Sequence, residues 1–290
     1  MTRHVLLPVV AMLMLLTGCA HTPSIPPALS PTVRLWQPDT APRGVILGLH
    51  SFGDFSAAFD LTGQALARAG YVVQSYDQAG FGDRGLHGHW AGETRLVDEA
   101  CQQIHQLADH YQQPVFLLGE SLGGAVAMLA ARQCPQQVAG LILAAPAVRE
   151  GIRFRYGWNL LIGSAAAVWP SYPLTVERDP QDPTLAPDSA LRLAEDPRVM
   201  RQVRMDTYWG LIKLADSASD MAAQLRQPTL LLYGGKDESV PRAGIDHLRQ
   251  HLAEHLSWHY YPQGPHLLLQ SRQWQDVTDD IRQWLADQSR

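Results

Sequence analysis

The sequence predicts an α/β fold in which a mostly parallel sheet is covered by helices on both faces. From Thr32 onward, short runs rich in β-forming residues alternate with stretches that have helical periodicity. Most of these runs are continuously apolar, as strands buried on both faces should be. The predicted strands span 45–50, 71–76, 114–119, 138–145, 228–234 and 256–261, and the predicted helices span 57–69, 93–110, 122–132 and 273–287.

The alternation fails between Pro146 and Gln227, a stretch with helical patches but no clear strand. A stretch of this length between two strands is too long for a simple loop. We predict a helical cap at about 147–226, within a domain of 32–290, above the strand ends where such sheets bind ligands. Its aromatic residues suit an acyl-binding pocket, although most of them, taken singly, are better explained as core of the cap. They are Phe154, Tyr156, Trp158, Trp169, Tyr172, Tyr208 and Trp209.

Arginines and aromatics interleave at 149–158, as they would at a lipid surface or a phosphate headgroup. A solvated helix face is the simpler interpretation of that run. Over the whole chain, a net charge of −5 with scattered Lys and Arg gives no basic face for a phosphate backbone. We therefore expect no nucleic-acid partner.

The first 18 residues have the features of an export signal: a basic start at Arg3, then an apolar run too short to span a bilayer. The sequence "LTGC", ending at Cys19, resembles the lipobox of bacterial lipoproteins, with ordinary secretion as the alternative. The resemblance implies a lipoprotein signal peptide at 1–18, a lipid on Cys19 and a proline-rich tether at 19–31. Ala20 implies sorting to the outer membrane, facing the periplasm, so we expect a lipid-anchored protein of the bacterial cell envelope.

If Cys19 carries a lipid, the chain keeps two further cysteines, Cys101 and Cys134. They could form one disulfide in an exported protein. Their predicted places, early in one helix and at the end of another, favour two free thiols. Neither has the spacing of a metal site.

The stretch "GESLGG", residues 119–124, places a serine between glycines after a predicted strand and before a predicted helix. Gly-x-Ser-x-Gly in that context is a nucleophile elbow, a strained turn that exposes the serine hydroxyl above the sheet. Ser121 is therefore the predicted nucleophile. A serine hydroxyl is weakly nucleophilic at neutral pH, so it needs a base and an acid that orients the base.

The partners of such a serine follow it in the order acid, then histidine. Asp237 and His266 each lie just after a predicted strand and are the predicted acid and base. Glu238 is a less favoured acid because it lies farther from the strand end. His247, His251 and His255 repeat every four residues and could bind a metal, but a polar helix face is the simpler interpretation. His87 and His89 are interpreted as loop residues near the site entrance.

The oxyanion formed in acyl transfer needs N–H donors that are already in place. We predict the backbone N–H of Leu122, directly after the nucleophile, and that of Phe52, in the loop after the first predicted strand.

The segments "HSFGDFS", "YDQAGFGDRG", "GESLGG", "YGGKDESVP" and "GPH", in this order, resemble the α/β-hydrolase superfamily, in particular its monoacylglycerol lipase and lysophospholipase branch. The resemblance covers the chain from about Val45 onward, with a loose match in the cap. It implies an esterase or lipase with Ser121, Asp237 and His266 as the triad, and no cofactor or metal. Ser51 stands where the family usually has glycine, which leaves the position of the second oxyanion donor less defined.

The predicted function is hydrolysis of a small-molecule ester or lipid, such as a monoacylglycerol or a lysophospholipid, through an acyl-enzyme. A proline-releasing peptidase on the same core is one alternative, and a non-catalytic envelope lipoprotein that binds a partner or a lipid is another. Filled triad positions argue against the second. His50 is expected to act through structural hydrogen bonds, and the sequence predicts no oligomeric state.

Overall fold

A computed structural model describes residues 31–85, 88–151 and 153–288. Its main sheet has seven strands in the order β1-β3-β2-β4-β5-β8-β9, all parallel except β1. The α/β prediction is therefore confirmed, and each of the six predicted strands is present. The strands are β1 (Val33–Trp36), β2 (Gly44–Leu49), β3 (Tyr71–Tyr76), β4 (Val115–Glu120), β5 (Val138–Ala144), β8 (Thr229–Gly234) and β9 (Leu256–Tyr261).

Strand β1 was not predicted. It is four residues long, pairs antiparallel with β3 at the edge of the sheet, and alternates between exposed and half-buried residues. Such a short, partly exposed strand lacks the continuous apolar run by which the central strands are recognised.

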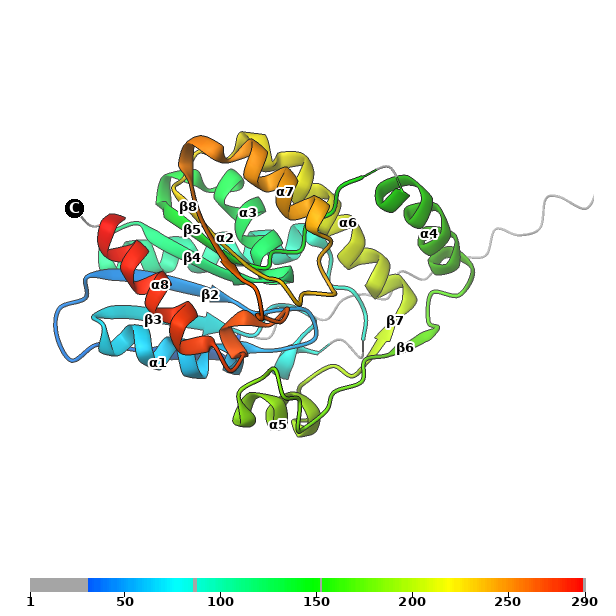
Figure 1. Cartoon of the computed structure of the whole chain (residues 1–290), viewed down its shortest axis with the longest axis horizontal. Helices are drawn as coiled ribbons and strands as arrows, with labels where there is room; N and C mark the ends of the chain where they lie inside the picture. The colour runs from blue at the N-terminus through cyan, green and yellow to red at the C-terminus, as the bar shows by residue number, and fades with distance from the viewer. Residues whose placement is uncertain (1–30, 86–87, 152, 289–290) are drawn as a thin grey trace, which may run out of the picture.

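Helices cover both faces of the sheet (Figure 1). Alternate strand residues point to opposite faces, so Val45 and Leu47 join one core while Ile46 joins the other. The helices α1 (Asp60–Arg68) and α8 (Trp274–Gln288) pack on the Ile46 side. On the opposite side pack α2 (Glu93–Tyr111), α3 (Leu122–Gln133), α6 (Met205–Met221) and α7 (Arg242–His251).

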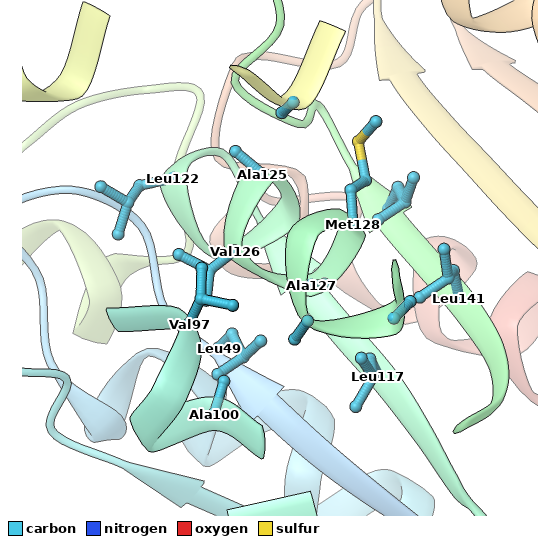
Figure 2. Close-up of a cluster of buried hydrophobic side chains, with 14 of the residues drawn as sticks. Leu49, Val97, Ala100, Leu117, Leu122, Ala125, Val126, Ala127, Met128 and Leu141 are labelled. Atoms are coloured by element: carbon cyan, nitrogen blue, oxygen red, sulfur yellow. The ribbon is translucent and has the colours of Figure 1, made fainter. Parts of the chain in front are cut away.

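The core around α3 is densely apolar. Figure 2 shows Val126 and Ala127 of α3 among side chains from the sheet and from α2.

The predicted helix at 57–69 proves to be a 3-10 turn followed by α1, and the other three predicted helices agree with α2, α3 and α8 to within two residues at either end. The 3-10 turns are Ser56–Phe59, Gly82–Arg84, Pro135–Gln137, Ala222–Gln224, Ala253–His255 and Leu268–Gln270.

Most of the segment between β5 and β8 lies beyond one end of the sheet, whereas α6 also runs back beside α3 and α7 on one face (Figure 1). The segment contains a π-helical turn (Arg153–Trp158), α4 (Asn159–Val168), α5 (Pro187–Glu195) and α6. The expectation of no strand there is wrong, because β6 (Pro173–Thr175) and β7 (Gln202–Arg204) pair as an antiparallel ribbon. Strands of three residues are too short to leave a periodic pattern. The division into a hydrolase core and a cap at about 147–226 stays a prediction, since α6 packs against both α3 and α4.

Cys101 and Cys134 form a disulfide, so the expectation of two free thiols is wrong. Helices α2 and α3 pack side by side on the same face of the sheet, which brings the two Cα atoms to 6.0 Å. That separation falls in the normal range for a disulfide. The helix positions were predicted correctly, but the packing of one helix against the other was not.

In the part of the chain that the structure describes, no helix is both long and apolar enough to cross a bilayer. The predicted signal peptide at 1–18, the lipid-bearing Cys19 and nearly all of the tether at 19–31 lie outside the described residues.

Candidate active site

Ser121 lies between the end of β4 and the first turn of α3, with φ 54° and ψ −115°. A side chain at this left-handed φ is strained, as a nucleophile elbow requires. Close packing requires glycine on both sides of Ser121. A Cβ on Gly123 would overlap the carbonyl oxygen of Leu49, and one on Gly119 would overlap the backbone of Gly123. Only glycine lets the turn approach the neighbouring strand this closely.

Asp237 and His266 come from the loops after β8 and β9, which are adjacent parallel strands. Backbone hydrogen bonds tie the two loops together, since Lys236 N–H donates to the oxygen of Gly264 at 2.9 Å. The Asp237 side chain is fully buried and its Oδ1 accepts the N–H groups of Ser239 and Val240 at 2.7 and 3.0 Å. These backbone hydrogen bonds therefore hold the Asp237 carboxylate in place independently of its contact with His266.

His266 joins the other two side chains. Its Nδ1 lies 2.9 Å from Oδ2 of Asp237, and its Nε2 lies 2.9 Å from Oγ of Ser121. In a neutral imidazole with the proton on Nδ1, the ring donates to the carboxylate and accepts the serine proton. The three predicted residues thus meet, although 145 residues separate Ser121 from His266.

The competing residues do not join this cluster. Glu238 is exposed beside the site. His247 and His251 are neighbours on α7, and their ring nitrogens lie within hydrogen-bond distance of the backbone carbonyls of Ser219 and His247. No group of three or more potential metal ligands is present in the described ranges. His89 is an exposed loop residue, and His87 lies outside the described residues.

His50 is buried at the end of β2 and has a structural role, as predicted. Its Nε2 accepts the backbone N–H of Gln78 at 3.0 Å, so the ring proton is on Nδ1, which donates to the oxygen of Ser51 at 2.9 Å. Burial lowers the pKa of His50, which keeps the ring neutral. The histidine thereby fixes the start of the loop that carries Phe52.

A buried polar network beside the triad was not predicted. Glu120, directly before Ser121, accepts the N–H of Leu269 at 2.9 Å and Nε2 of Gln270 at 3.0 Å. Gln270 also contacts Asp54 in the Phe52 loop, at 3.1 Å. Arg192 of α5 binds both oxygens of Asp54, at 2.5 and 2.9 Å, and Oε1 of Gln270 at 2.6 Å. The network therefore joins the nucleophile turn, the His266 loop, the Phe52 loop and the segment between β5 and β8.

Burial affects the two carboxyl groups of this network differently. It raises the pKa of Glu120 to about 7, against the opposing hydrogen bonds from Gln270 and Leu269. Burial also raises the pKa of Asp54, but the Arg192 guanidinium outweighs it and holds the pKa below the usual value. Asp54 is therefore ionised at neutral pH, whereas Glu120 titrates close to neutrality.

A cavity of about 710 Å³ opens above Ser121 and His266. Ser51 and Phe52 line one part of it, and aliphatic side chains from α4, β6 and α6 line much of the rest. Of the aromatics named from the sequence, Trp158 and Tyr208 line this cavity. Tyr156, Trp169 and Tyr172 are instead exposed on the surface, and the side chain of Phe154 lies outside the described residues.

Two arginines at the start of the same segment, Arg149 and Arg155, do not form a solvated face. Arg149 is buried and its guanidinium contacts Asp216 at 3.3 Å and Asn159 at 2.8 Å. Arg155 pairs with Asp220 at 2.6 Å. The solvated-face interpretation is wrong for these two arginines, because α6 presents carboxylates to both, whereas Tyr156 and Trp158 of the same run are exposed.

A parallel sheet with a strained serine turn, a histidine and an aspartate on the loops after successive strands defines an α/β hydrolase. Comparisons with known proteins agree with this class. The family profile described as serine aminopeptidase, S33 (Hydrolase_4) matches residues 40–273, so the chain belongs to that family.

Two curated relatives and one solved structure illustrate the similarity. The chain is 27% identical to a monoacylglycerol lipase of Mycolicibacterium smegmatis over 87% of this chain and 91% of the relative. It is 26% identical to phospholipase YtpA of Bacillus subtilis over 72% of this chain and 82% of the relative. A crystal structure of Paleococcus ferrophilus monoacylglycerol lipase superposes with a TM-score of 0.73 at 23% identity, covering 90% of this chain and all of that one, which supports the fold.

Proposed function

We propose that this protein hydrolyses carboxylic esters of monoacylglycerol or lysophospholipid type, with Ser121 as nucleophile, His266 as base and Asp237 as orienting acid. The observation that carries the proposal is the position of His266, 2.9 Å from both Ser121 Oγ and Asp237 Oδ2 at the floor of a largely apolar cavity. Family membership and the lipase relatives indicate a carboxylester hydrolase.

In this mechanism His266 takes the proton of Ser121 as Oγ attacks the ester carbonyl. Asp237 stabilises the resulting imidazolium. His266 then gives the proton to the departing alcohol, and water, activated by the same imidazole, releases the fatty acid from Ser121.

The tetrahedral oxyanion would be held by the N–H groups of Leu122 and Phe52. Leu122 is the first residue of α3, and the first N–H groups of a helix have no partner within the helix. Phe52 lines the same cavity as Ser121. The start of its loop is held by the hydrogen bond from His50 to the backbone oxygen of Ser51.

The test is a comparison of Ser121→Ala with the wild-type protein on matched substrates. We expect kcat to fall by about 10⁴- to 10⁶-fold, and labelling by a fluorophosphonate probe to be lost. Ser164→Ala, which removes an exposed hydroxyl on α4, is the matched control and should retain labelling. An unlabelled wild-type protein would instead favour a binding module without catalysis.

The substrate panel should contain monoacylglycerols, lysophospholipids and N-terminal proline amides, because the family description names aminopeptidases. The proposal predicts turnover of the esters in preference to the amides. Faster cleavage of a proline amide would overturn the ester assignment while leaving the catalytic residues in place.

We also propose that Cys19 anchors the protein to the bacterial cell envelope, at the outer membrane facing the periplasm. The support is the "LTGC" sequence and the proline-rich stretch after it. Acyl chains contribute about 0.8 kcal/mol per buried CH₂, so several chains hold a folded domain on a bilayer. Cys19→Ser should abolish incorporation of labelled palmitate and move the protein to the soluble fraction; an unchanged membrane fraction would contradict the anchor.

A further inference from the structure

The cavity above Ser121 is mostly apolar, but it contains one guanidinium that the proposed reaction does not use. Among the described residues that line it, the arginines are Arg149 and Arg178, and the only carboxylate is Glu238. Arg149 is paired with Asp216. Glu238 is exposed and follows the catalytic aspartate. Arg178 is therefore the lining cation whose role is not accounted for.

The backbone directs Arg178 into the cavity. Leu174, Val176 and Arg178 all line it, whereas Thr175 and Glu177 between them are exposed. This alternation is the period of two of an extended chain. It continues strand β6, since Val176 N–H still donates to the oxygen of Arg201 beyond the end of β7, at 2.9 Å.

The guanidinium of Arg178 has no protein partner in the described part of the chain. Its Nε is buried without a hydrogen bond, and no ion pair with a carboxylate forms there. The carboxylate that acts most strongly on it is Asp54, and both oxygens of Asp54 are already bound by Arg192. Arg178 as a whole is half-buried, but a buried N–H without a partner is costly, so such groups normally serve a ligand or hold an ordered water.

The electrostatic environment favours an anion at this position. Burial lowers the pKa of Arg178, and the neighbouring charge of Arg192 acts in the same direction. Asp54 and, more weakly, Asp182 act on Arg178 in the opposite direction, but neither forms an ion pair with it, and Asp54 is already bound by Arg192. An oxyanion beside Arg178 would supply the missing acceptor and the missing negative charge together.

We propose that Arg178 binds a phosphate oxyanion in the cavity, supplied either by the headgroup of a lysophospholipid or by free phosphate. The headgroup version rests on the proposed function, because it places the phosphate of the substrate in the same cavity as Ser121 and His266. Arg178 is then a specificity residue that selects anionic over neutral monoacyl esters.

The first experiment compares lauroyl lysophosphatidic acid with monolauroylglycerol, which differ by the phosphate. The measured quantity is the ratio of kcat/KM for the anionic ester to that for the neutral ester. Arg178→Met should lower this ratio by about 10- to 100-fold, the effect expected for loss of a charged hydrogen bond. Arg178→Lys keeps the charge but loses the planar fork, so the ratio should fall between those of the wild type and Arg178→Met.

Lys213→Met is the matched control, since it removes an exposed cation of α6 outside the cavity. The ratio should then equal that of the wild-type protein. A ratio that is the same in Arg178→Met and the wild type would overturn the proposal. So would an equal fall in Lys213→Met, which would indicate a general effect of surface charge.

The second experiment separates this site from catalysis and the headgroup from free phosphate. Calorimetry on Ser121→Ala should detect binding of dodecyl phosphate, and Ser121→Ala with Arg178→Met should bind about 10- to 100-fold more weakly. A larger loss of affinity on Arg178→Met for dodecyl phosphate than for inorganic phosphate supports a headgroup, and an equal loss for both supports free phosphate. If the wild type hydrolyses neither ester, the proposed function fails, while this binding comparison still decides the role of Arg178. Equal affinities for dodecyl phosphate with and without Arg178 would overturn the proposal that Arg178 binds phosphate.

Discussion

Replacement of Arg192 by methionine tests whether α5 is energetically tied to the loops of the proposed active site. Arg192 on α5 is the bidentate partner of Asp54, whose side chain is 1% exposed. Methionine keeps much of the aliphatic packing but removes the charge, both hydrogen bonds to Asp54 and the one to Gln270. Asp54 then retains the N–H of Phe55 and Nε2 of Gln270, neither of which is charged.

The expected cost is large because a buried carboxylate loses its counter-ion. Removing one partner of a buried ion pair typically costs about 3 to 5 kcal/mol in the free energy of unfolding. In the wild type the pKa of Asp54 is lowered, so this pair contributes stability above the unfolded pKa, and the contribution is lost as pH falls through the folded pKa. Without Arg192, burial raises the pKa of Asp54, and the variant loses stability as pH rises.

Urea unfolding at about pH 5 and about pH 8 measures both effects. The Arg192→Met variant should be less stable than the wild type at both pH values, and the deficit should be larger at the higher pH. In a double-mutant cycle with Asp54→Asn, the two changes should be less than additive by about 2 kcal/mol or more, because the double variant buries no unpaired charge. Arg198→Met is the control, since the ion pair of Arg198 with Asp196 is partly exposed and should be worth less than about 1 kcal/mol. Additive effects in the cycle, or a deficit no larger than that of Arg198→Met, would refute the reasoning.

Two further predictions concern buried groups outside the triad. Burial raises the pKa of Glu120 from 4.5 to about 7, so the folded protein binds more protons than the unfolded chain, and stability should fall by up to about 3 kcal/mol as pH rises from about 4.5 to about 7. In Glu120→Gln this fall in the free energy of unfolding should disappear when urea unfolding is measured across the same pH range. An unchanged dependence of stability on pH would assign the fall to other groups. The disulfide closes a loop with a sequence separation of 33, so Cys101→Ser with Cys134→Ser should lower the free energy of unfolding by about 3 to 4 kcal/mol under non-reducing conditions. Reductant should lower the stability of the wild type to that of the double variant and leave the variant unaffected; a wild type that does not respond would contradict the prediction.

The parts of the molecule that the sequence predicts are those with a local signal. Central strands such as β4 are continuous apolar runs, and Ser121 stands in a glycine pattern that only a tight strand-to-helix turn requires. Asp237 and His266 were found because parallel strands end at one edge of the sheet, so residues just after those strands converge. In each case, a few neighbouring residues contain enough information to place a side chain.

The parts that the sequence does not predict depend on packing between distant segments. Asp54 and Arg192 are 138 residues apart, and no motif at either position signals the other. The disulfide between Cys101 and Cys134 depends on which helices become neighbours on the same face. In the sequence, Arg178 is one of many scattered arginines. Only the alternation of side chains after β6, seen in the structure, shows that it points into the cavity. Pairings of this kind follow from tertiary geometry rather than from local sequence.

Glu120 shows why these unpredicted contacts bear on the catalytic geometry. It adjoins Ser121 on one side, and on the other its two oxygens accept hydrogen bonds from residues just after His266. One buried carboxyl therefore fixes the nucleophile turn and the base loop to each other, beside the contact of 2.9 Å between Ser121 and His266 themselves. Because Gln270 extends the same network to Arg192 on α5, a displacement of α5 would strain hydrogen bonds next to the proposed reacting groups. Catalysis loses rate steeply when reacting atoms move by about 1 Å. It follows that the position of α5 and the alignment of Ser121 with His266 are coupled through this buried network.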